Sequence, residues 1–201
     1  MTGAKPLRAS PMGAFFHCYA TALGACGIAW DDSGRVVGSQ LPEATPGETR
    51  DRMRARFPAA REVLERDALP AFVAVAVRGV ERLLAGDTAD AGELLAVTIA
   101  DEHLPAFQRE VLALTRRIPV GASLEYAEVA RRLGQPGAAR SVGQAEGHNP
   151  FAPIVPCHRV VAAVAGQGGF SAHGGLATKA RLLAIEARAA GHPLPEQDEL
   201  F

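Results

Sequence analysis

The sequence predicts an α+β fold in which a first half of mixed strands and helices precedes a mainly helical second half. Two observations favour this class. Short apolar runs interrupted by turn residues, such as Asp31-Asp32-Ser33-Gly34, are typical of antiparallel strands and occupy the beginning of the chain. Apolar residues at helical spacing then recur along the chain. With 201 residues, of which 48% are hydrophobic, the chain can form one large domain or two small ones.

The charge balance and the cysteine content argue against several classes of protein. Lys and Arg number 21 against 22 Asp and Glu, so no global basic excess indicates nucleic acid or a membrane as a partner. The three cysteines form no CxxC pair, which argues against a disulfide framework and a Cys-rich zinc site. The opening residues 1–13 lack the apolar core of a signal peptide, and no run of about 18 apolar residues occurs. We therefore expect a cytoplasmic protein without a membrane span.

Three strands and a helix are expected first. Residues 15–19, 27–30 and 35–41 are short apolar runs separated by glycine-containing turns, which predicts an antiparallel meander. A helix should follow over residues 46–57, with Thr45 as a possible N-cap. Its four alternating arginines are interpreted as a solvated face, and they are Arg50, Arg52, Arg54 and Arg56.

A second helix and a further strand are expected before the middle of the chain. Residues 70–85 carry apolar side chains on one side and end at Gly86, so this helix should pack on the meander. Residues 94–99 predict a short strand, and the polar segment 101–105 predicts a domain boundary. We therefore expect a supporting domain over 1–102, a second domain over 103–190 and a frayed tail over 191–201.

The second half is expected to contain a helix-turn-helix. After a helix over 106–116, Ser123 should cap a short helix over 124–133 whose acidic residues come early and whose arginines come late, as the helix dipole prefers. A glycine stops this helix, and Pro136 is well placed as the first residue of another that runs to about Glu146. Two short helices joined by a tight glycine turn form a helix-turn-helix.

The second of these helices consists almost wholly of small residues around one arginine, Arg140. Such a surface can approach a groove closely while a long cation projects from it, but small residues also let a helix pack tightly against a neighbour. Basic residues modestly outnumber acidic ones between residues 126 and 188, which is enough for a small phosphate-contacting footprint.

Cys157 is the candidate nucleophile. It lies between Pro156 and His158 in the apolar run 154–161, and a thiol becomes reactive when a base or cation sits beside it. The flanking apolar residues predict short buried strands on either side of a turn that holds the cysteine rigidly. The alternative is that Cys157 is a core residue, since free cysteines are commonly buried and sequence neighbours often point opposite ways.

A glycine-rich loop and a last helix follow. Residues 166–175 lack the spacing of a phosphate-binding P-loop and are expected to form a flexible lid or pocket wall. The helix over 176–190 carries an apolar stripe with Glu186 at its edge, beside Lys179. A carboxylate there can be partly buried and orient a histidine, or it can be a solvated glutamate paired with its lysine.

Several linked motifs in the second half resemble the O6-alkylguanine-DNA alkyltransferases, also called methylated-DNA-protein-cysteine methyltransferases. Pro156-Cys157-His158-Arg159-Val160 is similar to the active-site motif of that family. Residues 1–100 match only loosely. The resemblance implies an N-terminal ribonuclease-H-like domain and a C-terminal winged-helix-like helix-turn-helix alkyltransferase domain. The other matching segments, in the family order, are 118–126, 138–143, 149–150, 170–171, 174–179 and 182–186.

The resemblance implies direct-reversal DNA repair by a methyltransferase that acts once. The implied partner is double-stranded DNA carrying O6-alkylguanine, bound through its minor groove with the damaged base flipped into a pocket. No cofactor, metal or obligate protein partner is implied, and we expect a monomer.

The same resemblance assigns roles to individual residues. Cys157 would attack the alkyl carbon and keep it as a thioether. His158 would take the thiol proton through a water, Glu186 would hold the imidazole, and Tyr126 would donate a proton to the departing guanine. Arg140 would fill the gap left by the flipped base. The remaining residues are Ala138, Ala139, Ser141 and Gly143 toward DNA, Asn149, Ala152, Val160, Phe170 and Ser171 at the substrate pocket, and Lys179 and Arg159 in support.

Three positions depart from the family pattern. Glu146 places an acid where apolar or basic residues are common, which should weaken DNA binding unless the side chain points away. Ala172-His173 lengthen the loop that follows the pocket serine. Ala152 stands where some members have proline, which suggests a roomier pocket.

Two other functions are open alternatives. A helix-turn-helix lesion sensor would bind damaged DNA without chemistry, but its version in the family has another residue in place of the cysteine. A cysteine hydrolase that uses Cys157, His158 and Glu186 would turn over repeatedly, but it gives Arg140 no role.

Overall fold

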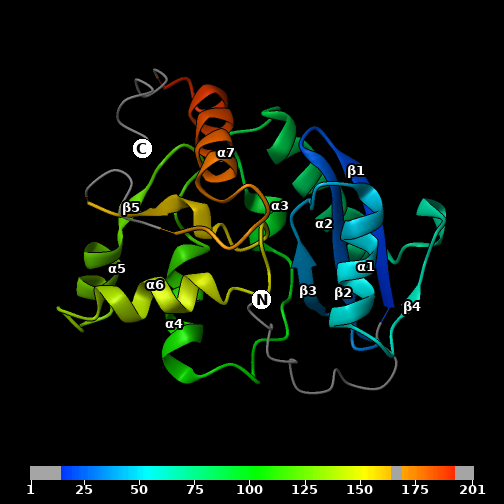
Figure 1. The fold of residues 1–201 in the computed structure, drawn as a ribbon, viewed down its shortest axis with the longest axis horizontal. Helices are drawn as coiled ribbons and strands as arrows, with labels where there is room; N and C mark the ends of the chain where they lie inside the picture. Colours follow the sequence, from blue (N-terminus) through cyan, green and yellow to red (C-terminus); the bar gives the residue numbers. More distant parts are fainter. Residues whose placement is uncertain (1–14, 164–168, 193–201) are drawn as a thin grey trace.

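The structure is a computed structural model that describes residues 15–163 and 169–192 (Figure 1). Its first half contains a four-stranded sheet in the order β3-β2-β1-β4. The strands β1 (Phe15–Thr21), β2 (Gly24–Trp30) and β3 (Val36–Gln40) pair antiparallel, which confirms the predicted meander. The short β4 (Arg61–Glu62) adds a parallel pairing with β1.

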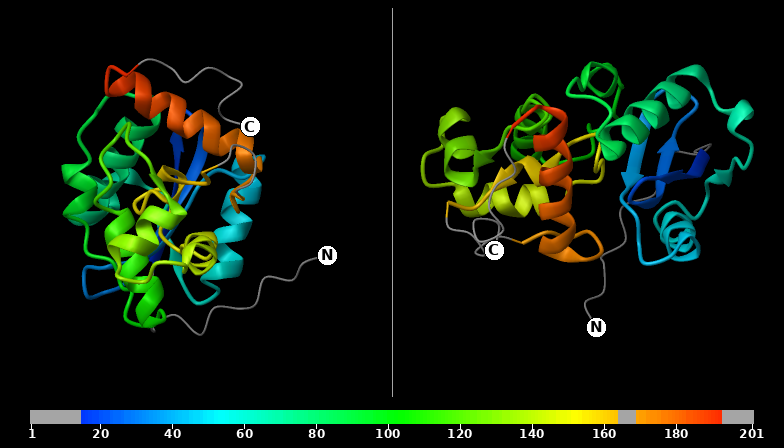
Figure 2. Two further views of the ribbon diagram at one scale, coloured as in Figure 1. Left: turned by 90° about the vertical axis from the view of Figure 1, so that its left-hand side faces the viewer. Right: turned by 90° about the horizontal axis from the view of Figure 1, so that it is seen from above.

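Two helices cover opposite faces of this sheet (Figure 2). α1 (Pro46–Arg56) is capped by the Thr45 side chain, as predicted, and packs on the face that presents Phe16. α2 (Ala71–Ala85) packs on the other face, which presents Ile28. Because successive residues of a strand point to opposite faces, the same strands supply both apolar clusters.

The strand predicted over residues 94–99 is wrong. The segment begins as the end of a short helix, α3 (Gly92–Leu95), and Ile99 then pairs with Val36 in an isolated bridge. Leu94 and Val97 are buried in the main apolar core. The apolar run therefore reflects the packing of individual side chains on α2 and its surroundings, which periodicity alone does not distinguish from a strand.

The second half consists of helices around a two-stranded sheet. β5 (Leu124–Glu125) pairs parallel with β6 (Val160–Val161). Within the described ranges, no helix has the length and apolar character needed to span a bilayer. The helices of this half are α4 (Ala106–Thr115), α5 (Tyr126–Arg132), α6 (Ala139–Gly147) and α7 (Gly175–Ala189).

The predicted starts of both helices of the helix-turn-helix are wrong. Pairing with β6 draws residues 124–125 into β5, so α5 begins at Tyr126 without the expected Ser123 cap. α6 begins later than predicted, at Ala139, because Gly137 has a φ of +100°, a conformation that a right-handed helix does not contain.

The main apolar core runs through both halves. It contains Ile28 and Val77 from the first half together with Leu112, Ile154 and Leu182 from the second. Residues on both sides of the predicted domain boundary therefore share one apolar core. The opening segment, part of the glycine-rich loop and most of the predicted tail lie outside the described residues, and they are 1–14, 164–168 and 193–201.

Arg56 does not belong to the predicted solvated face of α1. Its guanidinium donates hydrogen bonds to the Ser39 carbonyl at 2.9 Å and to the Pro150 carbonyl at 3.1 Å. The Ser39 N–H also donates to the Pro150 carbonyl at 2.9 Å, and the Ser39 hydroxyl donates to the Ala152 carbonyl at 2.8 Å. Arg56 and β3 thus fix the loop that precedes Cys157. The other three arginines, Arg50, Arg52 and Arg54, form surface ion pairs.

Replacing Arg56 by methionine is expected to lower the free energy of unfolding by about 1–3 kcal/mol, because half-buried carbonyls lose a charged donor. Arg52→Met is the matched control, since Arg52 lies on the same helix but is 50% exposed and paired with Glu43. It should change stability by less than about 0.5 kcal/mol. Urea denaturation of both variants measures the difference, and equal effects would refute the role of Arg56.

Candidate active site

Cys157 begins a single 3₁₀ turn, Cys157–Arg159, that leads into β6. The preceding residues Ile154 and Val155 form a turn rather than the predicted strand, and both are buried in the main core. Cys157 is only 7% exposed, yet it borders a pocket of about 510 Å³. The other residues that line this pocket are Tyr126, Ala139, Arg140, Gly143, Gln144, Glu146, Gly147, Gly169, Phe170 and Ser171.

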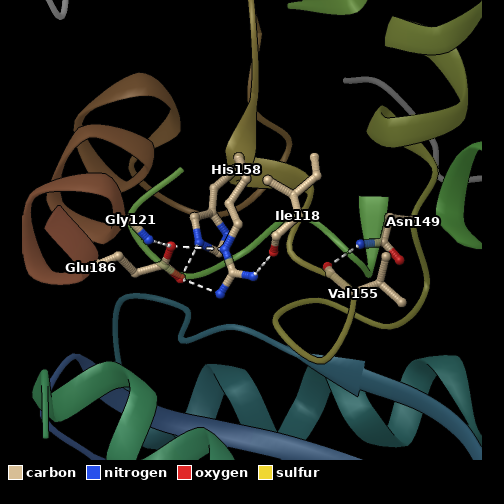
Figure 3. A network of polar contacts seen from close by, with 7 residues as sticks. Ile118, Gly121, Asn149, Val155, His158 and Glu186 are labelled. Atoms are coloured by element: carbon tan, nitrogen blue, oxygen red, sulfur yellow. Dashed lines mark hydrogen bonds and ion pairs between the residues drawn. The ribbon is translucent and has the colours of Figure 1, made fainter. Parts of the chain in front are cut away.

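The side chain of Asn149 fixes the loop before the cysteine (Figure 3). Its Nδ2 donates to the Val155 carbonyl at 2.8 Å, and its Oδ1 accepts from the Phe151 N–H at 2.9 Å. The Cys157 N–H donates to the same Val155 carbonyl at 3.0 Å. Asn149 therefore braces the turn that carries Cys157.

Glu186 is the centre of a buried polar network that includes His158, the residue after the cysteine (Figure 3). One carboxylate oxygen is 2.8 Å from His158 Nε2, and the guanidinium of Arg159 donates to both oxygens at 2.8 Å. Arg159 also donates to the Ile118 carbonyl, and the Gly121 N–H points at Glu186 from 3.4 Å. Glu186 is only 2% exposed, so the histidine-orienting alternative describes it and the solvated alternative is wrong.

The burial and the charges of this network determine the protonation state of His158. Burial lowers the pKa of His158, so the ring is neutral at physiological pH. Burial opposes the ionisation of Glu186, but hydrogen bonds and charges from His158 and Arg159 outweigh it and lower its pKa to about 2. A neutral ring that donates from Nε2 to the carboxylate leaves Nδ1 as an acceptor. Nδ1 is buried and has no hydrogen-bond partner among the described residues, so it can receive a proton.

The thiol of Cys157 is not ionised in advance. Burial, and to a lesser extent the charge of Glu146, raise its pKa to about 12, although the Asn149 amide and Lys179 act in the opposite direction. At neutral pH the thiolate fraction of such a group is on the order of one in 10⁵. Nucleophilic attack therefore requires a base that accepts the thiol proton during the reaction.

Tyr126 and Lys179 lie together on another side of the site. Burial raises the pKa of Tyr126, so the phenol is protonated and can donate. Lys179 Nζ lies 5.6 Å from the centre of the Tyr126 ring and donates to the Val160 carbonyl at 2.6 Å. Lys179 and Arg159 are both buried, so neither belongs to the predicted phosphate-contacting footprint.

The two interpretations of the small-residue helix apply to different faces of α6. Val142 and Ala145 are buried in a second apolar cluster beneath the helix-turn-helix. Arg140 and Ser141 are exposed on another face. Arg140 lines the rim of the pocket and has no ion pair or hydrogen bond with the described residues. One face of α6 thus packs tightly, and the other leaves a long cation available.

Glu146 points inward, which is the case in which an acid at this position need not weaken DNA binding. The Thr115 hydroxyl donates to its Oε1, and the side chain is only 5% exposed. Burial raises the pKa of Glu146 to about 8, while the Thr115 hydrogen bond and Lys179 oppose the shift. Glu146 therefore contributes a neutral acid to the pocket wall near pH 7, a feature that its sequence position did not reveal.

Seven of the predicted site residues line the pocket, and they are Tyr126, Ala139, Arg140, Gly143, Cys157, Phe170 and Ser171. The other candidates lie outside its lining. His158, Arg159 and Glu186 form the buried network, Asn149 braces the turn, and Val160 accepts a hydrogen bond from Lys179. Ser141 faces solvent, and Ala138 precedes α6. Ala152 also lies outside the lining and packs against the main core. The described His, Cys, Asp and Glu side chains form no group of three or more that could hold a metal ion.

The chain shares its second half with a known family. Residues 106–188 match the family model described as 6-O-methylguanine DNA methyltransferase, DNA binding domain. This segment is similar to that family over the matched residues. The matched segment holds the elements from α4 to α7, and with them Tyr126, Arg140, Cys157 and Glu186.

Individual relatives carry the same description. A methylated-DNA–protein-cysteine methyltransferase of Mycolicibacterium paratuberculosis is 48% identical over 99 residues, which are 49% of this chain and 59% of that protein. The Shigella flexneri protein of the same name is 46% identical over 80 residues, 40% of this chain and 46% of its own. The chain thus spans about half the length of the curated relatives that it matches.

The fold is similar to solved structures along most of its length. The crystal structure of the Mycobacterium tuberculosis OGT in complex with DNA has a TM-score of 0.64 and 27% identity, and covers 87% of this chain and 94% of its own. The M. tuberculosis O6-methylguanine methyltransferase has a TM-score of 0.62 and 28% identity over 90% of this chain and 96% of that one. The mixed α+β architecture is therefore shared with these structures.

Proposed function

We propose that this protein repairs DNA by direct reversal, transferring an alkyl group from the O6 atom of guanine to Cys157 in a single, irreversible event. The observation that carries the proposal is the position of Cys157 on the pocket wall, followed in the chain by His158, which is hydrogen-bonded to the buried Glu186. The family of residues 106–188 and the relatives named methylated-DNA–protein-cysteine methyltransferases support it.

The proposed step is a displacement at the alkyl carbon. The Cys157 sulfur forms the new S–C bond with its electron pair, and the bond between the carbon and guanine O6 breaks. The thiol proton passes through a water to Nδ1 of His158, whose Nε2–H stays bonded to Glu186. Tyr126 donates its proton to the departing guanine, which takes the electron pair of the broken bond. A thioether is a poor leaving group, so the protein acts once.

The proposed substrate is double-stranded DNA, approached by α6 from the minor groove. A base inside a duplex cannot reach Cys157, so the nucleotide must be flipped into the pocket at a free-energy cost of a few kcal/mol. The exposed face of α6 carries Arg140 at the pocket rim, where its side chain can occupy the space that the flipped base leaves. Ala138, Ala139, Ser141 and Gly143 are small enough to let the helix approach the groove.

The finer architecture follows from the same proposal. Residues 1–102 form a ribonuclease-H-like supporting domain, and residues 103–190 form the winged-helix-like alkyltransferase domain that holds Phe170 and Ser171 against the base. The tail begins at residue 191. The protein works in the cytoplasm as a monomer, without a cofactor or an obligate protein partner.

Mass spectrometry of the intact protein tests this function. After incubation with a duplex that contains one O6-methylguanine, we expect a gain of one methyl group per chain, located on Cys157 by peptide mapping. An unmodified protein that still binds the lesion would indicate a sensor. Repeated turnover of an ester or peptide substrate would indicate a cysteine hydrolase. Either result would overturn the proposal.

Arg140→Ala is expected to slow transfer from duplex DNA by about tenfold or more, since a flipped nucleotide loses the side chain that replaces it in the stack. Transfer from the free base O6-benzylguanine should fall much less. Arg131→Ala is the matched control, because Arg131 is an exposed arginine on the neighbouring α5 that is paired with Glu128. Rate constants on both substrates check this, and equal losses would mean that Arg140 has a structural role.

A further inference from the structure

Glu146 lines the pocket and carries a buried carboxyl oxygen that has no hydrogen-bond partner among the described residues. It lies on α6 between two other lining residues, Gly143 and Gly147, and its two carboxyl oxygens differ. Oε1 accepts from the Thr115 hydroxyl, which ties α6 to α4. Oε2 is buried and has no hydrogen-bond partner among the described residues.

A structural role accounts for only one of these oxygens. The bond to Thr115 needs Oε1 alone, and a buried polar atom without a partner is unfavourable, so few occur in folded proteins. Because Glu146 lines the pocket, a group bound there can supply the missing partner for Oε2.

The surroundings of Glu146 indicate which part of a substrate would meet it. Glu146, Cys157 and Tyr126 line the same pocket, so the Glu146 carboxyl group belongs to the wall of the space that holds these two reacting groups. The alkyl group of the substrate sits between the sulfur and the guanine oxygen. A substituent on that alkyl group is therefore the part nearest to Oε2. Since burial keeps the acid mostly neutral at pH 7, a neutral hydroxyl is a better partner than a charged group.

We propose that Glu146 is a specificity-determining residue that hydrogen-bonds a hydroxyl on the transferred alkyl group. The protein then takes 2-hydroxyethyl adducts of guanine O6 in preference to n-propyl adducts of the same size. This inference rests on the proposed alkyl transfer. The chemistry of the step is unchanged: the S–C bond forms, the C–O6 bond breaks, and the hydroxyl is carried over intact.

The test compares two adducts of equal size in the same duplex. Second-order rate constants are measured for O6-(2-hydroxyethyl)guanine and O6-n-propylguanine with the unaltered protein, Glu146→Gln and Glu146→Met. The ratio of the two rate constants isolates recognition of the hydroxyl, because a general change in folding or reactivity affects both adducts. Melting by circular dichroism verifies that each variant is folded.

We expect Glu146→Met to lower the ratio of hydroxyethyl to propyl transfer about tenfold, the effect of one buried hydrogen bond. Glu146→Gln retains a polar group and should keep most of the preference. A ratio that is the same in all three proteins would overturn this inference while leaving alkyl transfer intact. Failure of the unaltered protein to react even with O6-methylguanine would instead overturn the proposed function, and this inference with it.

Discussion

Replacing Cys157 by alanine is expected to abolish alkyl transfer completely, with no methyl group gained from a duplex that carries O6-methylguanine. The variant has no atom that can form the new bond to carbon. Cys157→Ser should be equally inactive over the same period, because a serine hydroxyl at this buried site is far harder to deprotonate than a thiol. Both variants should still bind the lesion, since the pocket walls and Arg140 remain. Intact-protein mass spectrometry and fluorescence-detected DNA binding measure the two properties.

Cys18→Ala is the matched control for this result. Cys18 is a half-buried free cysteine whose pKa burial raises to about 11, but it lies on β1, on the face of the sheet covered by α1. It should transfer one alkyl group per chain, as the unaltered protein does. Transfer that persists in Cys157→Ala and disappears in Cys18→Ala would refute the assignment of the nucleophile.

Replacing Glu186 by glutamine is expected to lower the free energy of unfolding by about 3–5 kcal/mol, because the buried guanidinium of Arg159 loses its counter-charge. Transfer should slow by about hundredfold or more, since the neutral amide no longer stabilises a protonated His158. Chemical denaturation measures the first effect and single-turnover kinetics measure the second.

Two variants make this result specific. Glu128→Gln removes a carboxylate that also pairs with two arginines, Arg131 and Arg132, but at the surface, and should leave the stability nearly unchanged. The double variant Glu186→Gln/Arg159→Met leaves no unpaired charge and should be more stable than Glu186→Gln alone. A double variant that is less stable by the sum of both single losses would contradict the buried ion pair.

The pKa shifts of Glu186 and His158 predict how the free energy of unfolding depends on pH. The pKa of Glu186 is about 2 in the folded protein, below the unfolded value of about 4.3, so its contribution is fully present above pH 4.3. That contribution disappears as the pH falls from about 4.3 to about 2. His158, whose pKa burial lowers, adds a loss in the same direction that begins near about pH 6.5. Glu186→Gln should lack the lower step, as acid titration of the unfolding free energy can measure.

The nucleophile could be predicted from sequence, but its electrostatic setting could not. A cysteine beside a histidine in a rigid apolar run indicates reactivity, and the family motifs extend this to Tyr126 and Arg140. The stripe predicted on α7, through Leu176 and Leu183, places Glu186 at an edge. The structure buries Lys179, Leu182 and Glu186 instead. Which side of α7 is buried depends on the ion pair of Glu186 with Arg159. Arg159 lies in another segment of the chain, so the residue pattern within α7 does not indicate this side.

Arg56 and Glu146 both have hydrogen-bond partners that their local sequence does not indicate. Alternating arginines on α1 predict an exposed row, yet the last of them reaches the carbonyls of β3 and of the loop before Cys157. The sequence leaves open whether Glu146 faces phosphates or points away, and in the structure it shares the buried side of α6 with Val142 and accepts a hydrogen bond from Thr115. In both cases a hydrogen-bond partner far along the chain decides whether a charged residue is buried.

The matched segment 106–188 is not an independent folding unit, because the main apolar core extends from the sheet into the second half. Cut out of the chain, it would turn Leu112, Phe151 and Leu182 toward water and leave the carbonyls of Pro150 and Ala152 without their donors from Ser39. Segments that evolve together need not melt separately. Because the apolar core is shared, we expect the two halves to unfold in one transition, in which the turn that carries Cys157 loses its shape together with the sheet.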